Sequence, residues 1–493
     1  MLLHEALCRR YHILLLDAVN ELQLYCESDP GLPMLNQIQL FLKEEREIIP
    51  YIISAEELKA KFDLSKSTGN AHAPSTDRLL DMLTMDHSLE YILKESARED
   101  INSAEDNSAP TIRIIDNLLN EAIQQRASDI HLEYYETGIN IRFRIDGVMK
   151  FIVRCDSRLA PPLISRIKIM AKLDIAERRL PQDGRFMTQV AGHPVDVRVS
   201  IIPNVNGERV VLRLLDKSRT LLTLDALGLF PHQQKVIQTL LQAPHGIILV
   251  TGPTGSGKST TLHTCLTSLT LTRGSLLTIE DPVEYEIPGV GQTQVNEKIG
   301  MTFASGLRAI LRQDPDVVMI GEIRDPETAV VAIQASLTGH LVLSTLHTNT
   351  ALGAINRLCD MGSESYLLAS SLVGIIAQRL VRRLCPHCKH AFPITPEQKA
   401  FFSGLECPEQ LWQPEGCEIC HGEGFFGRVG LYHIVSVNKT IKQAIQRAAG
   451  EEELEKCMHG TDSLFQDGLN KVAAGLVTLE DVLQVTGGRN GDI

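Results

Sequence analysis

The chain has 493 residues, of which 43% are hydrophobic and 22% charged, a size and composition that predict several domains rather than one core. It contains no run of about 18 uncharged apolar residues, and residues 1–22 lack the ordered regions of a signal peptide. We therefore expect a cytoplasmic protein without a membrane span. The net charge is −13, and residues 1–110 contribute −10 of it, with 20 acidic against 10 basic side chains. This acidic balance argues against nucleic acid and anionic lipid headgroups as partners.

The acidic front end is predicted to be a small helical docking domain, residues 1–95, followed by a polar linker, residues 96–110. Apolar residues recur at helical spacing over residues 1–65, and a second helical pattern covers 76–94 after a polar stretch. The linker has too few apolar side chains to bury itself. Two interpretations of the negative charge stay open: a solvated surface, or a segment that docks on a protein partner.

Residues 111–218 are expected to form an α+β domain. A helical pattern covers residues 111–124, and three alternating segments, 130–135, 139–146 and 148–154, are typical of strands. Asp146-Gly147 joins the last two segments and is a strong hairpin signal.

Residues 228–384 alternate short β-branched runs with helical patterns, which predicts an α/β domain with a parallel sheet and crossover helices. The expected strands are 247–250, 276–279, 317–320 and 341–345. Residues 385–421 hold two pairs of cysteines, and residues 422–493 are expected to form a helical subdomain.

A phosphate-binding loop is predicted after the first of these strands. It consists of Gly252, Pro253, Thr254, Gly255, Ser256, Gly257, Lys258, Ser259 and Thr260. The glycines let backbone N–H groups wrap around a phosphate, and the N-terminus of the following helix adds partial positive charge. In this pattern the lysine reaches the β- and γ-phosphates and Ser259 ligates Mg²⁺, so we expect the chain to bind ATP with Mg²⁺.

Two carboxylates are expected beside this loop. Glu322 follows strand 317–320, at the place where a P-loop protein needs an acid linked to the magnesium ion, whereas Asp316 at the other end is interpreted as a structural cap. Glu284 follows strand 276–279 and is favoured for polarising the attacking water. Carboxyl ends of parallel strands meet at one edge of a sheet, so both acids are expected in the same crevice. Which of Glu284 and Glu322 is the general base stays open.

Histidines and arginines are weaker candidates. His340 and His347 flank strand 341–345, and they are either structural residues or sensors of the γ-phosphate. Arginines often stabilise charge in phosphoryl transfer, and the candidates are Arg198, Arg213, Arg308 and Arg312. The last two lie four apart and are predicted on one face of a helix. All four matter for catalysis only if two domains close over one nucleotide, and otherwise are solvated or paired with surface acids.

A structural metal site is predicted from the cysteines. Cys385 and Cys388 form one CxxC pair and, after 28 intervening residues, Cys417 and Cys420 form a second. Each pair can present two thiolates to one tetrahedral ion, so we expect bound Zn²⁺. Free thiols or a coincidental pairing are the alternatives.

Together these segments resemble the type II/type IV pilus secretion ATPase family. The resemblance rests on GPTGSGKST, EDPVEYEIPGVGQTQVN, LRAILRQDPDVVMIGEIRD, LTGHLVLSTLHTNTA and the two CxxC pairs, and it extends from about residue 111 to 485. The segment QTQVN and the length of the front end are closest to the type II secretion (GspE) branch.

The resemblance implies an α/β fold: a RecA-like P-loop ATPase core preceded by a PAS-like α+β domain and a small helical N-terminal domain, with a zinc-binding insertion. It also implies a homohexamer on the cytoplasmic face of the bacterial inner membrane, docked on GspL-like and GspF-like platform proteins. ATP hydrolysis would then drive assembly of a pseudopilus that exports folded proteins. In the family's terms, Glu280 to Glu284 match the Asp box, Glu322 the Walker B carboxylate, and His340 and His347 the His box, while the four arginines match those that reach nucleotide phosphates.

Three other functions are compatible with parts of this pattern. A type IV pilus assembly ATPase would use the same chemistry on a different fibre. A nucleic-acid-dependent ATPase would need basic, aromatic-rich surfaces, whereas this chain is acidic and has one Trp. A scaffold that binds ATP without hydrolysing it is disfavoured by the presence of both Glu284 and Glu322.

Overall fold

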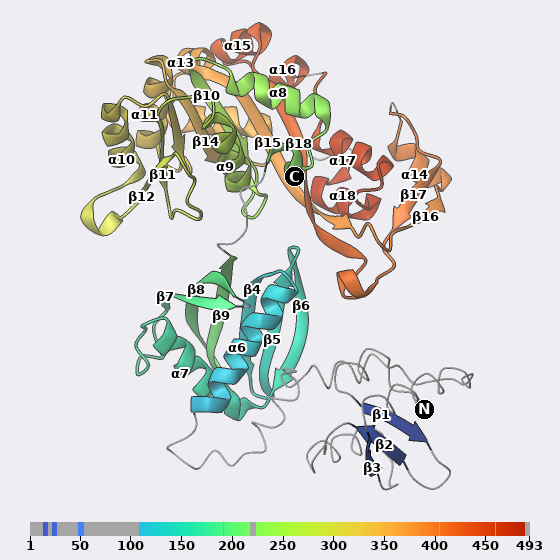
Figure 1. The fold of residues 1–493 in the computed structure, drawn as a ribbon. Coiled ribbons are helices and arrows are strands. Elements are labelled where there is room, and N and C mark those ends of the chain that lie inside the picture. The colour runs from blue at the N-terminus through green and yellow to red at the C-terminus, as the bar shows by residue number, and fades with distance from the viewer. Residues whose placement is uncertain are drawn as a thin grey trace. The chain divides into compact units, whose positions relative to one another are not determined.

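The computed structural model describes residues 13–17, 22–26, 48–53, 108–190, 192–216, 223–403, 405–458 and 460–488. The chain divides into two compact units, residues 1–119 and 120–493, and the division falls inside helix α6 (Ser108–Gln124) (Figure 1). Among the residues described, no helix combines the length and the apolar character that crossing a membrane requires.

The first unit contains a three-stranded sheet made of β1 (Ile13–Asp17), β2 (Leu22–Cys26) and β3 (Ile48–Ile52). β1 pairs antiparallel with β2, and β2 pairs parallel with β3. The helical prediction is wrong for these segments, because apolar runs of four or five residues fit a strand as well as a helix. The predicted helix 76–94 and most of the predicted linker lie outside the described residues.

The second unit begins with a six-stranded antiparallel sheet in the order β6-β5-β4-β9-β8-β7. Its elements are β4 (Ala127–Tyr135), β5 (Gly138–Ile145), β6 (Val148–Cys155), α7 (Ala160–Met170), β7 (Gln182–Val190), β8 (His193–Asn204) and β9 (Gly207–Asp216). The Asp146-Gly147 turn joins β5 to β6 as predicted. Helix α6 confirms the helix predicted over residues 111–124. The PAS-like character of this region and the domain boundaries stay predictions.

A seven-stranded sheet in the order β12-β11-β13-β14-β10-β15-β18 forms the centre of the larger fold. The strands are β10 (Gly246–Thr251), β11 (Leu276–Glu280), β12 (Gly291–Gln294), β13 (Val317–Ile320), β14 (Leu341–Leu346), β15 (Leu372–Leu384) and β18 (Phe425–Ser436). All neighbours are parallel except β18, which pairs antiparallel with β15. The four strands predicted from the sequence are confirmed. β18 was not predicted, and it lies in the span expected to be helical.

Helices cover both faces of this sheet, which explains why its central strands β10, β13 and β14 are buried at every position. Ile247 and Leu249 of β10 belong to one core, and Ile248 and Val250 belong to the other. The first core is closed by α10 (Phe303–Ile310), α11 (Pro326–Leu337), α12 (Ala351–Asp360), α13 (Ser365–Ser371), α15 (Lys439–Gln446) and α16 (Glu451–Cys457). The second is closed by α8 (Pro231–Leu241) and α9 (Lys258–Leu269).

A third core surrounds the C-terminal part of β15 and the N-terminal part of β18, which pair with each other. It combines Val381 and Leu431 from these strands with side chains from β17 (Gln410–Gln413), α17 (Leu464–Ala473) and α18 (Leu479–Thr486). The cysteine segment also contains β16 (His390–Pro393), paired with β17, and α14 (Pro396–Phe401).

A fully buried ion pair holds α17 against β18. Lys471 donates to Asp467 at 2.6 Å and to the carbonyl of Gly430 at 2.7 Å, and neither charged side chain is exposed. Asp467 also accepts from the backbone N–H of Tyr432 and from the side chain of Gln233, both at 2.8 Å. The charges are thus fully hydrogen-bonded, which is the condition under which a buried pair is tolerated.

Candidate nucleotide and metal sites

The glycine loop connects the carboxyl end of β10 to the N-terminus of α9, in the strand–loop–helix context that the sequence predicts. Gly255 (φ 78°) and Gly257 (φ 88°) have left-handed backbone conformations that favour glycine. A Cβ atom on Gly252 would lie 2.4 Å from the carbonyl oxygen of Gln378. The backbone can take this compact path only because these positions carry no side chain.

Lys258 lies buried over the same loop. Its Nζ donates to the carbonyl oxygens of Gly252 at 2.8 Å and Pro253 at 3.0 Å. Burial lowers the pKa of Lys258 to about 8, and the carboxylate of Glu322 opposes this shift. The hydroxyl of Ser256 is also buried and has no hydrogen-bond partner within the described part of the chain. Ser259, by contrast, is exposed in the first turn of α9.

Glu322 follows β13 and is 9% exposed, at the edge of the sheet where the loop lies. One carboxylate oxygen lies 2.6 Å from Nη2 of Arg324, and the other lies 3.2 Å from Nε2 of His347. His347 follows β14, the strand between β13 and β10, so parallel pairing brings the three segments together. Arg324 was missed by the sequence analysis, although it stands two residues after the predicted acid.

His340 does not reach this edge. It precedes β14, its backbone carbonyl accepts from the N–H of Gly246 at the start of β10, and its ring Nδ1 lies 2.9 Å from the carbonyl of Ala335. The seven residue steps from His340 to His347 span about 20 Å of extended chain. Two histidines that bracket one strand lie at opposite edges of a sheet, so within one chain only His347 lies beside the P-loop. The role of a γ-phosphate sensor stays a prediction.

Two acids, one at the end of β11 and one four residues beyond it, have different surroundings. Glu280 is buried and lies 2.9 Å from His263, 2.6 Å from Thr278 and 2.9 Å from Gln292. Burial alone would raise the pKa of Glu280, but these hydrogen bonds outweigh it and lower the pKa. Glu284 is partly exposed and accepts two hydrogen bonds from Arg198 of β8, at 3.0 and 2.9 Å.

The other predicted arginines lie elsewhere. Arg213 pairs with Asp129 at 3.0 Å, and Arg308 pairs with Glu327 at 2.6 Å. Arg312 donates to the carbonyl of Arg308. Helix α10 ends at Ile310, so Arg312 belongs to a short 3-10 turn (Leu311–Gln313) and not to the helix face predicted for it. Of the four predicted arginines, only Arg198 contacts a predicted catalytic acid in the part of the chain that the structure describes.

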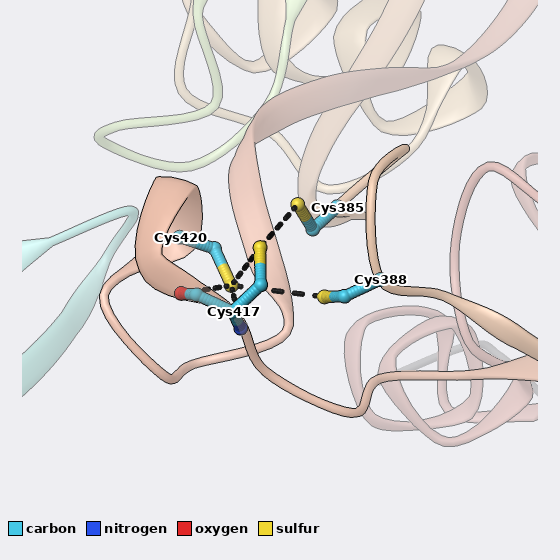
Figure 2. A group of neighbouring side chains, drawn as sticks. All are labelled: Cys385, Cys388, Cys417 and Cys420. Carbon is cyan, nitrogen blue, oxygen red and sulfur yellow. Dashed lines mark hydrogen bonds between the residues drawn. The ribbon is translucent and has the colours of Figure 1, made fainter. Parts of the chain in front are cut away.

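The four predicted cysteines form one cluster (Figure 2). The Sγ–Sγ distances are 3.9 Å for Cys385–Cys417, 3.7 Å for Cys388–Cys420 and 3.7 Å for Cys417–Cys420. A tetrahedral site with bonds of about 2.3 Å requires sulfur separations of about 3.8 Å. Burial would raise the pKa of Cys420, but the N–H groups of Cys417 and Gly424 outweigh it and lower the pKa to about 6. The cluster can therefore hold a tetrahedral metal ion.

A parallel sheet with a glycine loop between strand and helix, a buried lysine over that loop and an acid at the end of a neighbouring strand define a P-loop ATPase. Residues 104–484 match the family described as type II/IV secretion system protein. The chain belongs to this family.

The chain is 55% identical over 391 residues to type II secretion system protein E of Aeromonas hydrophila, covering 79% of this chain and 78% of the relative. It is 53% identical over 390 residues to type II secretion system ATPase E of Vibrio cholerae serotype O1, covering 79% and 77%. The crystal structure of the pilus retraction motor PilT with bound ADP is similar, with 30% identity, a TM-score of 0.53 and coverage of 76% of this chain and 98% of that one.

Proposed function

We propose that this chain is the cytoplasmic ATPase of a type II secretion system, hydrolysing ATP to drive pseudopilus assembly and export of folded proteins across the outer membrane. The observation that carries the proposal is the identity of more than half to type II secretion E proteins over about four-fifths of the chain. The family match over residues 104–484 spans both the P-loop and the cysteine cluster. The P-loop geometry supports the hydrolytic chemistry.

In this proposal the loop residues 252–257 bind the phosphates of ATP through their backbone N–H groups. Lys258 exchanges its two backbone carbonyl partners for the β- and γ-phosphates, and Ser259 ligates Mg²⁺. The magnesium ion, when bound, neutralises charge that develops on the phosphates. The carboxylate of Glu322 faces the same site, and in the structure its two oxygens lie beside Arg324 and His347.

Glu284 is proposed as the general base. Its carboxylate is held by Arg198, so a shift of Arg198 towards a nucleotide phosphate would free the base at the moment when the phosphate is in place. Arg213, Arg308 and Arg312 are proposed to act only across a subunit boundary of a homohexamer, because within one chain they are paired elsewhere.

Zinc is the proposed occupant of the cysteine cluster. The sulfur separations fit a tetrahedral ion, and backbone N–H groups of Gly416, Cys417 and Gly424 donate to two of the sulfurs, which favours thiolates. The family resemblance adds the partners: GspL-like and GspF-like platform proteins at the inner membrane, with residues 1–95 as the docking domain and no nucleic acid.

The test compares ATP turnover of the full chain with that of two variants. Lys258→Ala should abolish turnover, and Glu322→Gln should reduce kcat by about a hundredfold or more while nucleotide still binds. The matched control is Glu452→Gln, an exposed acid of α16 that pairs with Lys456 and touches no proposed site residue. Undiminished turnover in Lys258→Ala would refute the P-loop assignment.

The client is tested separately with the full chain. Capture by the cytoplasmic domain of a GspL-like protein from the same organism, but not by a pilus platform protein, is the expected result. Capture by the pilus platform alone would move the function to type IV pilus assembly and leave the ATPase chemistry unchanged.

A further inference from the structure

One buried polar side chain next to the P-loop has no role in the function proposed above. Gln378 lies in β15 and is 1% exposed, in a stretch whose preceding residues, 374–377, are buried and carry no polar side chain. Ala377 pairs with Thr251, the last residue of the strand that leads into the P-loop. Burying an amide costs free energy unless it is hydrogen-bonded, so its presence here requires a partner.

The partner is the helix that follows the P-loop. Thr261 of α9 donates from its hydroxyl to Oε1 of Gln378 at 2.7 Å, and Thr261 itself is fully buried. This bond joins residues 117 positions apart in the sequence. It fixes the first turn of α9, which carries Lys258 and Ser259, to a strand on the other side of the loop.

The same residue also touches both ends of the glycine loop. A Cβ atom on Gly257 would lie 2.8 Å from Nε2 of Gln378, and one on Gly252 would lie 2.4 Å from its carbonyl oxygen. These glycines therefore pack directly on Gln378. The neighbouring Arg379 donates to the same carbonyl at 3.2 Å and to Asn349 at 3.1 Å. These bonds link Gln378 to the segment that follows β14.

Gln378 is also held by the neighbouring strand β18. Tyr432 of β18 is the antiparallel partner of Gln378, and its hydroxyl lies against Thr261 while donating to the carbonyl of Leu227 at 3.1 Å. The backbone N–H of Tyr432 is held by the buried carboxylate of Asp467. Gln378 thus has little freedom to move away from the loop.

We propose that Gln378 is a positioning residue for nucleotide binding: through Thr261 and the two glycines, it holds the P-loop and the first turn of α9 in the conformation that receives the phosphates. The inference rests on the proposed ATPase function. Because Gln378 acts on the loop and not on the reacting atoms, its loss weakens nucleotide binding more than it slows the chemical step.

The experiment measures the Kd of a fluorescent ADP analogue with Mg²⁺, and kcat at saturating ATP, for full-length variants. Gln378→Met keeps the length and removes the amide, and Thr261→Val removes the hydroxyl without changing the shape. The matched control is Thr264→Val, because Thr264 is equally buried on α9 but donates only to Thr260 of its own helix. Thr261→Ser keeps the hydroxyl and serves as the conservative rescue.

We expect Kd to rise at least tenfold in Gln378→Met and in Thr261→Val, with kcat changed less than threefold. The double variant Gln378→Met with Thr261→Val should have a Kd no higher than that of the weaker-binding single variant, because both substitutions remove the same hydrogen bond. Thr264→Val and Thr261→Ser should stay within twofold of the parent. If Gln378→Met does not fold, Thr261→Val decides the question, since it retains Gln378.

A Kd within twofold of the parent in folded Gln378→Met or in Thr261→Val would overturn the proposal. So would equal weakening by Thr264→Val, which would indicate a general loss of helix packing. Failure of the parent chain itself to bind the analogue would instead refute the proposed ATPase function, so the two failures are distinguishable.

Discussion

The lowered pKa of Lys258 predicts a specific pH dependence of nucleotide binding. Without nucleotide, burial places this pKa at about 8, so the protonated fraction is nearly complete at pH 7 and falls tenfold per unit well above pH 8. A bound phosphate favours the charged ammonium and raises the pKa in the complex. Affinity is therefore constant below pH 8 and declines above it, with Kd about tenfold higher at pH 9 than at pH 7.

Isothermal titration of the full chain with MgADP between pH 6.5 and 9.5 measures this effect. The control is Lys258→Arg, whose guanidinium stays charged over the whole range and should give a flat profile, whatever its absolute affinity. Glu322→Gln removes the carboxylate that opposes the shift, so its break should move below pH 8. A parent Kd that stays constant to pH 9.5, or a break that moves upward in Glu322→Gln, would refute the reasoning.

Three further predictions concern stability and metal content. Lys471→Met should lower the free energy of unfolding by about 3–5 kcal/mol in urea titrations, because it leaves the buried carboxylate of Asp467 unpaired. A smaller loss in the double variant that also carries Asp467→Leu would verify this cause. Tyr432→Phe should cost about 1–2 kcal/mol in the same assay, since it leaves the carbonyl of Leu227 without its donor, and no loss would contradict the bond. Cys417→Ser should abolish bound zinc, measured by elemental analysis of purified protein, and full retention of one equivalent would exclude the cluster as the zinc site.

Local sequence patterns predicted the features that depend on a few adjacent residues. The P-loop, the strands on either side of it and the two CxxC turns each have a short signature, and the structure places all of them as expected. Glu322 was also predictable, because an acid that follows an apolar strand of a parallel sheet must lie at the carboxyl edge.

Features that depend on distant residues were not predictable in the same way. His340 seemed equivalent to His347 because both lie next to one strand, but strand direction separates them by about 20 Å. The cysteine segment separates β15 from β18 in the sequence, so no short spacing between the two strands indicates that they pair. Gln378 carries a weak signal, a polar residue directly after an apolar run, and its partner Thr261 lies 117 positions away.

The pairing of β15 with β18 has a consequence for how the cysteine segment is attached to the motor. Leu384 pairs with Phe425, so residues 385–424 are, in topological terms, the loop of one long hairpin whose stem is part of the main sheet. A tight turn in their place would leave the order of the sheet unchanged. Their packing makes them more than a replaceable loop, because Ile394 and Leu411 share a hydrophobic core with Phe465 and Leu469 of α17. Ile394 and Leu411 would lose these apolar neighbours if the segment were exchanged without α17, so the metal module and the C-terminal helices form one packing unit.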